Sequence, residues 1–464
     1  MGVSARSGIG ALILCAALLT APGAAHAAPH TGWEPPNMMA VPRAVPEIID
    51  RVVPAPPYPR LATIPQRAQA PGFDEQTLSL REAALPSPTG DPMFDRWSPT
   101  LREHTPGDVL AVRDVTAVAA PLVSAPITRA RLIKFASTDA LGRPSFGTAT
   151  ILEPRNAAPI RGPRPILVNN IPIDSLGTAC TPGYTMAHGI SAASNGGDLV
   201  PPTTQLALAR GYTVIVPDHE GPRMAYAEPT VAGHVVLDSI RAAAALDASR
   251  FGAGRVAVTG YSGGAIATDG AAKLVATYAP ELVGRIVGAA MGGVPTDYRM
   301  LVGSMNANLA TGLFHAATFG IARERPSILT MANNLAQWLA TSPLKNACEL
   351  PLAIAGVTFM PMQLMSNDPD PFHSPVAEHI YRVTEMAGAK SAVPLYIYQG
   401  AQEFWIPAAG ARELFEQQCR LGAVATYREV PGEHVIAAIS GYPGALEWLD
   451  ARLRGVPARS GCRT

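Results

Sequence analysis

The sequence predicts an α/β fold in which a mostly parallel sheet carries an inserted helical cap. Apolar strand-like runs alternate with amphipathic helical patterns along much of the 464-residue chain, as in βαβ units. The run 255–259 ends in Gly260-x-Ser262-x-Gly264 and is followed at once by a helix-compatible segment of small residues, which predicts strand, sharp turn and helix. A helical stretch from about 296 to 391 interrupts the alternation, which predicts an insertion into the fold.

The first 27 residues have the pattern of a signal peptide. Arg6 precedes an apolar run from Ile9 to Leu19, and Ala25-His26-Ala27 fits an A-x-A cleavage site. The apolar run is too short to span a bilayer. We therefore expect a secreted, soluble protein without an integral membrane anchor.

Residues 28–84 are rich in proline and have little apolar periodicity, which predicts an extended or partly disordered N-terminal arm. Ordered structure is expected from near Leu85, where the first part of the core, 85–295, begins. Alternating patterns predict early antiparallel strands, and continuous apolar runs predict buried parallel strands. In chain order we expect strands at 108–115, 129–136, 147–152 and 165–169, a helix at 203–210, a strand at 212–217, a helix at 231–248, the strand at 255–259, a helix at 265–278 and a strand at 285–290.

The rest of the chain divides into the cap, 296–391, and the last part of the core, 392–464. Within the cap, helices are expected at 328–339 and 375–386, and a methionine-rich run lies at 359–365. The sheet then resumes, with a strand at 393–398, a helix at 408–419, a strand at 426–430 and a closing helix at 443–454.

The charge and the cysteine content limit the possible partners. The formal net charge is zero, which argues against electrostatic capture of nucleic acid or of an anionic membrane. Removal of the signal peptide leaves four cysteines, and in an oxidising compartment these predict two disulfides with three possible connectivities. The four are Cys180, Cys348, Cys419 and Cys462.

No cofactor is expected, and no metal site is predicted. Asp218-His219-Glu220 has metal-ligating residue types, but three consecutive side chains of an extended segment cannot all face one ion. The segment predicts a turn stabilised by side-chain hydrogen bonds instead.

The turn at 260–264 is typical of a nucleophile elbow. Flanking glycines let strand and helix approach, so that Ser262 is held in a strained backbone with its Oγ exposed. A serine needs a base and an orienting acid, which in this arrangement follow in the order serine, acid, histidine. His434 is the histidine beyond the strand 426–430. No aspartate lies between Asp370 and His434, so the acid must be a glutamate, and Glu403 follows the strand ending near 400 directly.

Several motifs in this order resemble the secretory lipase family of fungi and bacteria, α/β-hydrolases of the Candida antarctica lipase A type. The resemblance covers the chain from about Leu85 to the C-terminus. The matching residues are Asp91-Pro92, Asp174-Ser175 with Cys180, Asp218-His219-Glu220-Gly221, Gly260-Tyr-Ser-Gly-Gly264, Tyr278-Ala-Pro-Glu281, Glu416-Gln-Gln-Cys419 and Glu433-His434.

The resemblance implies an α/β-hydrolase that cleaves esters of fatty acids through an acyl-enzyme. It implies that Ser262 is the nucleophile, His434 the base and Glu403 the acid, where Glu403 stands for the aspartate of the family pattern. It also implies an oxyanion hole made by the backbone N–H groups of Gly263 and Asp174, because an ionised Asp174 side chain would repel an oxyanion. The implied disulfides are Cys180–Cys348 and Cys419–Cys462.

Other interpretations stay open at this point. The methionine-rich run suits either an adaptable acyl-binding surface or ordinary core. A carboxylesterase of small or short-chain esters would share every catalytic residue. A secreted peptidase of the same fold, or a catalytically weak binding protein, would also fit the elbow. The expected partner is a lipid ester, possibly met at a lipid–water interface, and the sequence predicts no oligomeric state.

Overall fold

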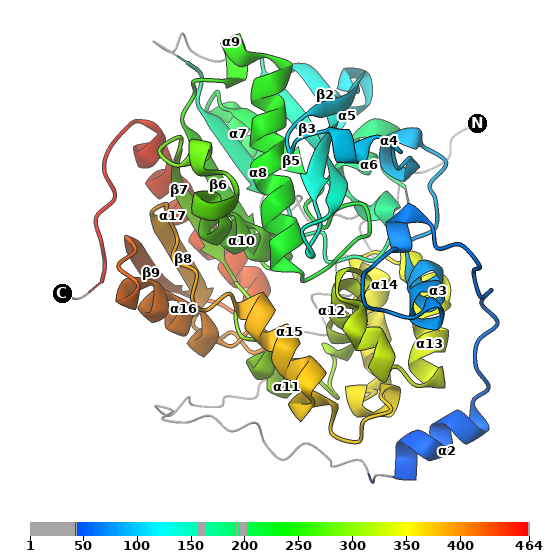
Figure 1. Ribbon diagram of the computed structural model, residues 1–464. Coiled ribbons are helices and arrows are strands. Elements are labelled where there is room, and N and C mark those ends of the chain that lie inside the picture. Colours follow the sequence, from blue (N-terminus) through cyan, green and yellow to red (C-terminus); the bar gives the residue numbers. More distant parts are fainter. Residues whose placement is uncertain (1–41, 43, 156–162, 192–193, 195–201, 463–464) are drawn as a thin grey trace, which may run out of the picture. The chain divides into compact units, whose positions relative to one another are not determined.

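The computed structural model describes residues 42, 44–155, 163–191, 194 and 202–462, all within one compact unit, Asn37–Thr464 (Figure 1). The predicted signal peptide, the first part of the N-terminal arm and the two C-terminal residues lie outside the described residues. Among the described residues, no helix is long and apolar enough to cross a membrane.

Nine strands of the described residues form one sheet in the order β1-β2-β3-β5-β4-β6-β7-β8-β9. Strands β1, β2, β3 and β5 pair antiparallel, and the strands from β5 through β4 to β9 pair parallel. This sheet confirms the predicted α/β fold. The strands are β1 (Val109–Asp114), β2 (Ile127–Thr138), β3 (Pro144–Pro154), β4 (Ile166–Asn170), β5 (Thr213–Pro217), β6 (Val256–Tyr261), β7 (Ile286–Gly292), β8 (Leu395–Gly400) and β9 (Ala425–Val430).

Helices cover both faces of the sheet, which explains why every residue of β4 and β5 is buried and why most of them are apolar. One core lies under α8 (Pro229–Leu246), α10 (Gly263–Tyr278) and α16 (Ala408–Arg420). The other lies under α5 (Thr116–Leu122), α6 (Pro182–His188), α7 (Thr203–Ala209) and α17 (His434–Leu453). Short elements elsewhere are α4 (Pro92–Asp95), α9 (Ala248–Phe251), η1 (Gln66–Ala68), η2 (Leu101–Glu103), η3 (Thr178–Cys180) and η4 (Pro280–Leu282).

The chain between β7 and β8 is helical and encloses a third apolar core. We call its helices the inserted helices: α11 (Tyr298–Met305), α12 (Thr311–Glu324), α13 (Asn334–Thr341), α14 (Glu349–Ile354) and α15 (Pro375–Glu385), with η5 (Pro326–Met331), η6 (Pro343–Asn346), η7 (Ala355–Thr358), η8 (Met362–Met365) and η9 (Pro371–His373). The helix predicted at 328–339 is two elements, because Asn333 caps α13 by accepting a hydrogen bond from the Ala336 N–H. Helix α12, which is apolar on most sides, was not predicted.

The prediction that residues 28–84 form an extended arm is wrong for two of its segments. Helices α2 (Ala44–Val52) and α3 (Glu75–Ala84) lie there, so ordered structure begins before Leu85. Asp74 begins α3 by accepting a hydrogen bond of 2.7 Å from the Thr77 N–H. The prolines of the surrounding arm obscured this helix, although its own ten residues contain none.

The structure contains the two implied disulfides, Cys180–Cys348 and Cys419–Cys462. The first joins η3, which follows β4, to the residue that precedes α14. The second joins the end of α16 to the C-terminal segment. The first disulfide therefore fixes the loop after β4 to the inserted helices.

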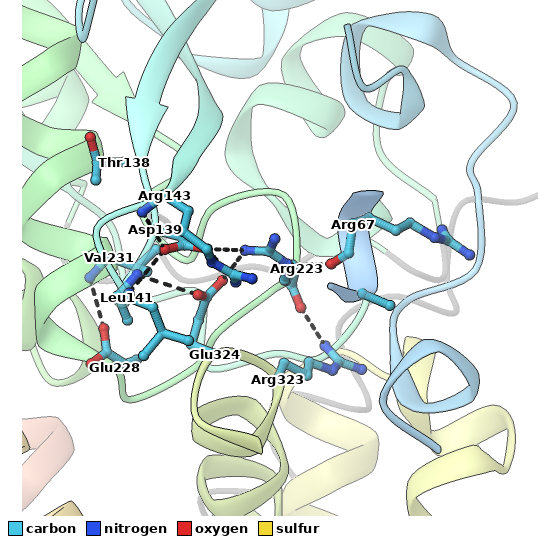
Figure 2. Close-up of polar contacts among 12 residues, drawn as sticks. Arg67, Thr138, Asp139, Leu141, Arg143, Arg223, Glu228, Val231, Arg323 and Glu324 are labelled. Carbon is cyan, nitrogen blue, oxygen red and sulfur yellow. Dashed lines mark hydrogen bonds and ion pairs between the residues drawn. The ribbon is translucent and has the colours of Figure 1, made fainter. Parts of the chain in front are cut away.

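A buried ionic network connects the inserted helices to the sheet domain (Figure 2). The Arg223 guanidinium lies 2.9 Å from a Glu324 carboxylate oxygen and 3.3 Å from Asp139, and all three side chains are buried. Arg323 of α12 donates to the backbone carbonyls of five residues in four separate segments, namely Ala84, Leu176, Arg223, Met224 and Lys345. Burial lowers the pKa of Arg323 to about 9, which still leaves it charged at neutral pH.

Replacing Arg323 by Met should destabilise the protein by about 3 kcal/mol or more, because buried carbonyls would lose their donor at about 1–3 kcal/mol each. The midpoint of urea unfolding measures this loss. Arg412→Met is the matched control, because the ion pair of Arg412 with Glu429 is exposed and contributes at most about 1 kcal/mol. Equal shifts of the midpoint in the two variants would contradict the role given to Arg323.

Candidate active site

The turn between β6 and α10 holds Ser262 in the backbone conformation of a nucleophile elbow, with φ 53° and ψ −122°. A Cβ atom at position 260 would lie 2.1 Å from the Gly264 carbonyl oxygen, and one at position 264 would lie 1.9 Å from the Asn170 carbonyl oxygen. Only glycine fits at either position. The sequence motif is thus explained by close backbone contacts on both sides of the serine.

The structure brings together the three residues for which the sequence predicts a catalytic role. His434 Nε2 lies 3.0 Å from Ser262 Oγ, and His434 Nδ1 lies 2.6 Å from Glu403 Oε2. The Glu403 side chain is fully buried and that of His434 is 11% exposed. The two contacts form one continuous chain from carboxylate to imidazole to hydroxyl.

The loop after β8 holds the carboxylate of Glu403 in place. Its Oε1 accepts hydrogen bonds from the N–H groups of Trp405 at 2.9 Å and Ile406 at 3.1 Å, which leaves Oε2 for His434. Burial would raise the pKa of Glu403, but His434 and these two amides outweigh it and hold the pKa below its usual value. Glu403 is therefore ionised over the neutral range.

His434 is the first residue of α17, not part of a loop, so the predicted helix start at Pro443 is wrong by nine residues. Glu433 caps the helix by accepting from the N–H groups of Val435 and Ile436. Tyr261, the residue before the elbow serine, donates a hydrogen bond of 2.5 Å from its hydroxyl to the His434 carbonyl. Burial lowers the pKa of His434, but Glu403 and other nearby carboxylates raise it above its usual value.

The two residues expected to form the oxyanion hole, Gly263 and Asp174, also lie beside Ser262. Asp174 has a positive φ of 47°. A Cβ atom added to Gly263 would lie 1.8 Å from Asp174 Oδ1, so this oxygen lies directly beside Gly263. Burial raises the pKa of Asp174 to about 6, although His434, the Gly263 N–H and the Ser262 hydroxyl lower it. The Asp174 side chain thus faces the elbow, which the sequence did not indicate.

Two further carboxyl groups lie near Asp174, and sequence reasoning assigned neither to the site. Glu220 Oε1 accepts a hydrogen bond of 3.4 Å from the N–H of Ser175, the residue after Asp174. Burial and the Asp174 charge raise the pKa of Glu220 well above its usual value, and they raise that of Glu349, the first residue of α14, to about 8. The Asp-His-Glu-Gly motif drew attention to Glu220, but the sequence alone predicted a structural turn there and not a place beside the elbow.

The neighbours of Glu220 in that motif do have structural contacts. Asp218 accepts hydrogen bonds of 2.5 Å from the Thr148 hydroxyl and 2.7 Å from the Gly183 N–H. His219 contacts the Ile171 carbonyl through Nε2 at 2.9 Å, which supports the loop that carries Asp174. Within the described part of the chain, no group of three or more His, Cys, Asp or Glu side chains is arranged to hold a metal ion.

A cavity of about 150 Å³, partly open to solvent, extends from Ser262 into the inserted helices. Its lining contains no Asp, Glu, Lys, Arg or His side chain. Aromatic and aliphatic residues dominate, and Met362 and Met365 of the methionine-rich run are among them. This arrangement can hold a long apolar group with one end at the serine.

Comparison with known proteins identifies the family. Residues 203–461, more than half of the chain, match the secretory lipase family. The protein belongs to the secretory lipase family. It is a carboxylic ester hydrolase of the lipase type. This agrees with the resemblance seen in the sequence motifs.

The relatives of this secretory lipase include a protein named as a probable inactive lipase and one named as an esterase. A probable inactive lipase of Mycobacterium tuberculosis is 29% identical over 381 residues, which cover 80% of this chain and 83% of the relative. A trichothecene C-3 esterase of Fusarium sporotrichioides is 29% identical over 398 residues, covering 82% and 86%. The closed state of Candida antarctica lipase A matches with a TM-score of 0.72 at 23% identity, covering 82% and 89%, and shows the same fold.

Proposed function

We propose that this secretory lipase is secreted and hydrolyses esters of fatty acids through an acyl-enzyme, with Ser262 as nucleophile, His434 as base and Glu403 as orienting acid. The observation that supports the proposal most is the chain of contacts from Glu403 through His434 to Ser262 at an uncharged, apolar cavity. Secretion is supported by the signal-peptide pattern and by the two disulfides.

In the first half-reaction, Ser262 Oγ attacks the ester carbonyl carbon while His434 Nε2 takes the hydroxyl proton. The tetrahedral oxyanion is stabilised by the Gly263 and Asp174 N–H groups. His434 then gives its proton to the leaving alcohol, and the acyl group stays on Ser262. Glu403 holds Nδ1–H of His434, which fixes the tautomer whose Nε2 can accept a proton.

In the second half-reaction, water attacks the acyl-enzyme as His434 Nε2 accepts one of its protons. The collapse of the second tetrahedral intermediate breaks the bond to Ser262 Oγ, which recovers its proton from His434, and the carboxylic acid leaves. The inserted helices act as a cap that keeps water away from the acyl chain. Burial of each methylene of that chain contributes about 0.8 kcal/mol to binding.

A second candidate function is hydrolysis of small or short-chain esters. The relative named trichothecene C-3 esterase favours it, because that protein is named for an ester of a small molecule. Both functions use the same catalytic residues, and only the occupant of the cavity differs.

Hydrolysis of p-nitrophenyl esters from acetate to palmitate distinguishes the two functions. We expect kcat/KM to be highest for a medium or long chain. Ala317→Phe, which places a ring into the cavity wall from α12, should lower kcat/KM for the longest esters by about tenfold more than for acetate, the equivalent of about two buried methylenes. Ala409→Phe, at an exposed position of α16, is the control. An optimum at acetate that Ala317→Phe leaves unchanged would favour the small-ester function.

A further inference from the structure

The loop after β4 carries Asp174 past the nucleophile elbow in a backbone conformation that needs support. Asp174 has a positive φ of 47°, which costs a residue with a side chain some free energy that surrounding contacts must offset. The loop passes so close to the elbow that Asp174 Oδ1 lies directly beside Gly263. The proposed oxyanion hole therefore depends on the contacts that hold this loop.

The Ser175 hydroxyl makes two of these contacts. It donates a hydrogen bond to the Ile173 carbonyl, two residues back along the chain, and it accepts one of 3.0 Å from the Glu349 N–H. Ser175 is 0% exposed, so water does not compete for either partner. Its own N–H is bound as well, to Glu220 Oε1 at 3.4 Å. One small side chain thus bridges the loop after β4 to the inserted helices.

The carbonyl that Ser175 binds belongs to the same peptide unit as the Asp174 N–H. A peptide unit is planar, so its carbonyl and its N–H turn together and point to opposite sides. The hydrogen bond on the Ile173 carbonyl therefore also fixes the direction of the Asp174 N–H. This direction matters, because an oxyanion donor contributes most when it is already aimed before the reaction begins.

The other end of the bridge is the start of α14. Glu349 is the first residue of this helix, and an N–H in the first turn has no partner within the helix. Cys348 provides no side-chain cap, and Ser175 Oγ takes the Glu349 N–H instead. The Leu176 N–H donates at 2.9 Å to the Ala347 carbonyl, and the disulfide at Cys348 joins the same two segments. The inserted helices therefore help to set where the Ser175 hydroxyl lies.

We propose that Ser175 is a positioning residue of the oxyanion hole: its hydroxyl orients the peptide unit between Ile173 and Asp174, and the first N–H of α14 orients the hydroxyl. The inference rests on the proposed function, in which the Asp174 N–H stabilises the tetrahedral oxyanion. Ser175 acts through the backbone of its neighbours and not on the reacting atoms. Through this bridge the inserted helices contribute to catalysis as well as to the wall of the cavity.

Ser175→Ala removes the bridge. With p-nitrophenyl butyrate, kcat should fall about 10–100-fold, somewhat less than when an oxyanion donor is removed outright. KM should stay within about threefold, because the interaction is made in the transition state and not with the bound substrate. Active sites are counted by labelling Ser262 with a p-nitrophenyl phosphonate, so that a loss of folded protein is not mistaken for a loss of kcat.

Inhibition by butylboronic acid separates positioning from a merely structural role. This compound forms a tetrahedral adduct with Ser262 Oγ, and one oxygen of the adduct occupies the place of the oxyanion, so its affinity reports the transition state. Its Ki should rise in Ser175→Ala by about the same factor by which kcat falls. A substitution that only loosened the inserted helices would raise KM instead.

Ser391→Ala is the matched control. Ser391 is 3% exposed, and its hydroxyl likewise donates to a carbonyl two residues away, that of Val393, at 2.7 Å. It precedes β8, whereas Glu403 follows the other end of that strand. Ser391→Ala should therefore cost stability as Ser175→Ala does, but it should leave kcat and the Ki of butylboronic acid unchanged.

Ser175→Cys decides the matter if Ser175→Ala gives no protein that can be labelled. A thiol is similar in size to the hydroxyl but forms much weaker hydrogen bonds, so kcat should fall and Ki should rise by about 3–10-fold. The positioning role would be overturned by kcat and Ki within about twofold of the wild type, by a loss confined to KM, or by an equal fall of kcat in Ser391→Ala. In each case hydrolysis that depends on Ser262 would remain, whereas failure of the proposed function would appear as its absence from the wild type.

Discussion

Replacing Ser262 by Ala should lower kcat for ester hydrolysis by about 10⁵–10⁶-fold, since the triad acts as a unit and loss of its nucleophile removes covalent catalysis. The Ser262 side chain is partly exposed, and its Oγ contacts His434 and Asp174, so folding should not change. Initial rates with p-nitrophenyl butyrate measure the effect. Mass spectrometry after treatment with a p-nitrophenyl phosphonate should show one adduct on the wild type and none on the variant.

Ser249→Ala is the matched control, because Ser249 is an exposed residue of α9 whose hydroxyl donates a hydrogen bond to Asp247. It should keep full activity and full labelling. Residual activity of Ser262→Ala within about tenfold of the wild type would exclude Ser262 as nucleophile, because acyl transfer without it leaves only binding and oxyanion stabilisation. The family membership would stand in that case, and the comparison with the probable inactive relative would become the relevant one.

The placement of Ser262 and His434 next to each other could be predicted from the sequence, because Ser262 depends on a local turn and His434 on chain order. The glycines around Ser262 reflect backbone contacts within one turn and with β4, and these exclude every other residue type. His434 follows from chain order alone, since one histidine lies after the last strand. Glu403 follows from the absence of any aspartate between Asp370 and His434 and from its place directly after the strand that ends near 400. The parallel strands were equally accessible, because burial on both faces produces continuous apolar runs.

The carboxyl groups near Asp174 could not be predicted in the same way. Asp174, Glu220 and Glu349 come from three segments that only the folded sheet and the disulfide Cys180–Cys348 bring together. The buried position of Arg323 could not be predicted either, since no sequence pattern marks a buried arginine that donates to backbone carbonyls. The start of α17 was misplaced because Pro443 favours a first helical turn, whereas the cap at Glu433 begins the helix nine residues earlier.

Glu403→Gln should lower kcat by about 10³–10⁴-fold with little change in KM, because an amide at this position no longer stabilises the imidazolium and favours the wrong tautomer of His434. The amide oxygen can still accept from the N–H groups of Trp405 and Ile406, which leaves the NH₂ group facing Nδ1. His434 would then present Nε2 with a proton attached, and that nitrogen could not act as base. Steady-state kinetics at several pH values measure the change.

Glu403→Asp tests the length of the side chain that this secretory lipase uses where the family pattern has aspartate. A carboxylate shortened by one methylene, about 1.5 Å, cannot reach both His434 and the two amides in the present loop. We expect kcat to fall by about 10–100-fold, the loss typical of a misplaced catalytic group. Glu433→Gln is the matched control, because glutamine can still cap α17 and kcat should stay within about threefold. Full activity of Glu403→Asp would mean that the loop moves to follow the shorter side chain, and full activity of Glu403→Gln would exclude Glu403 as the triad acid.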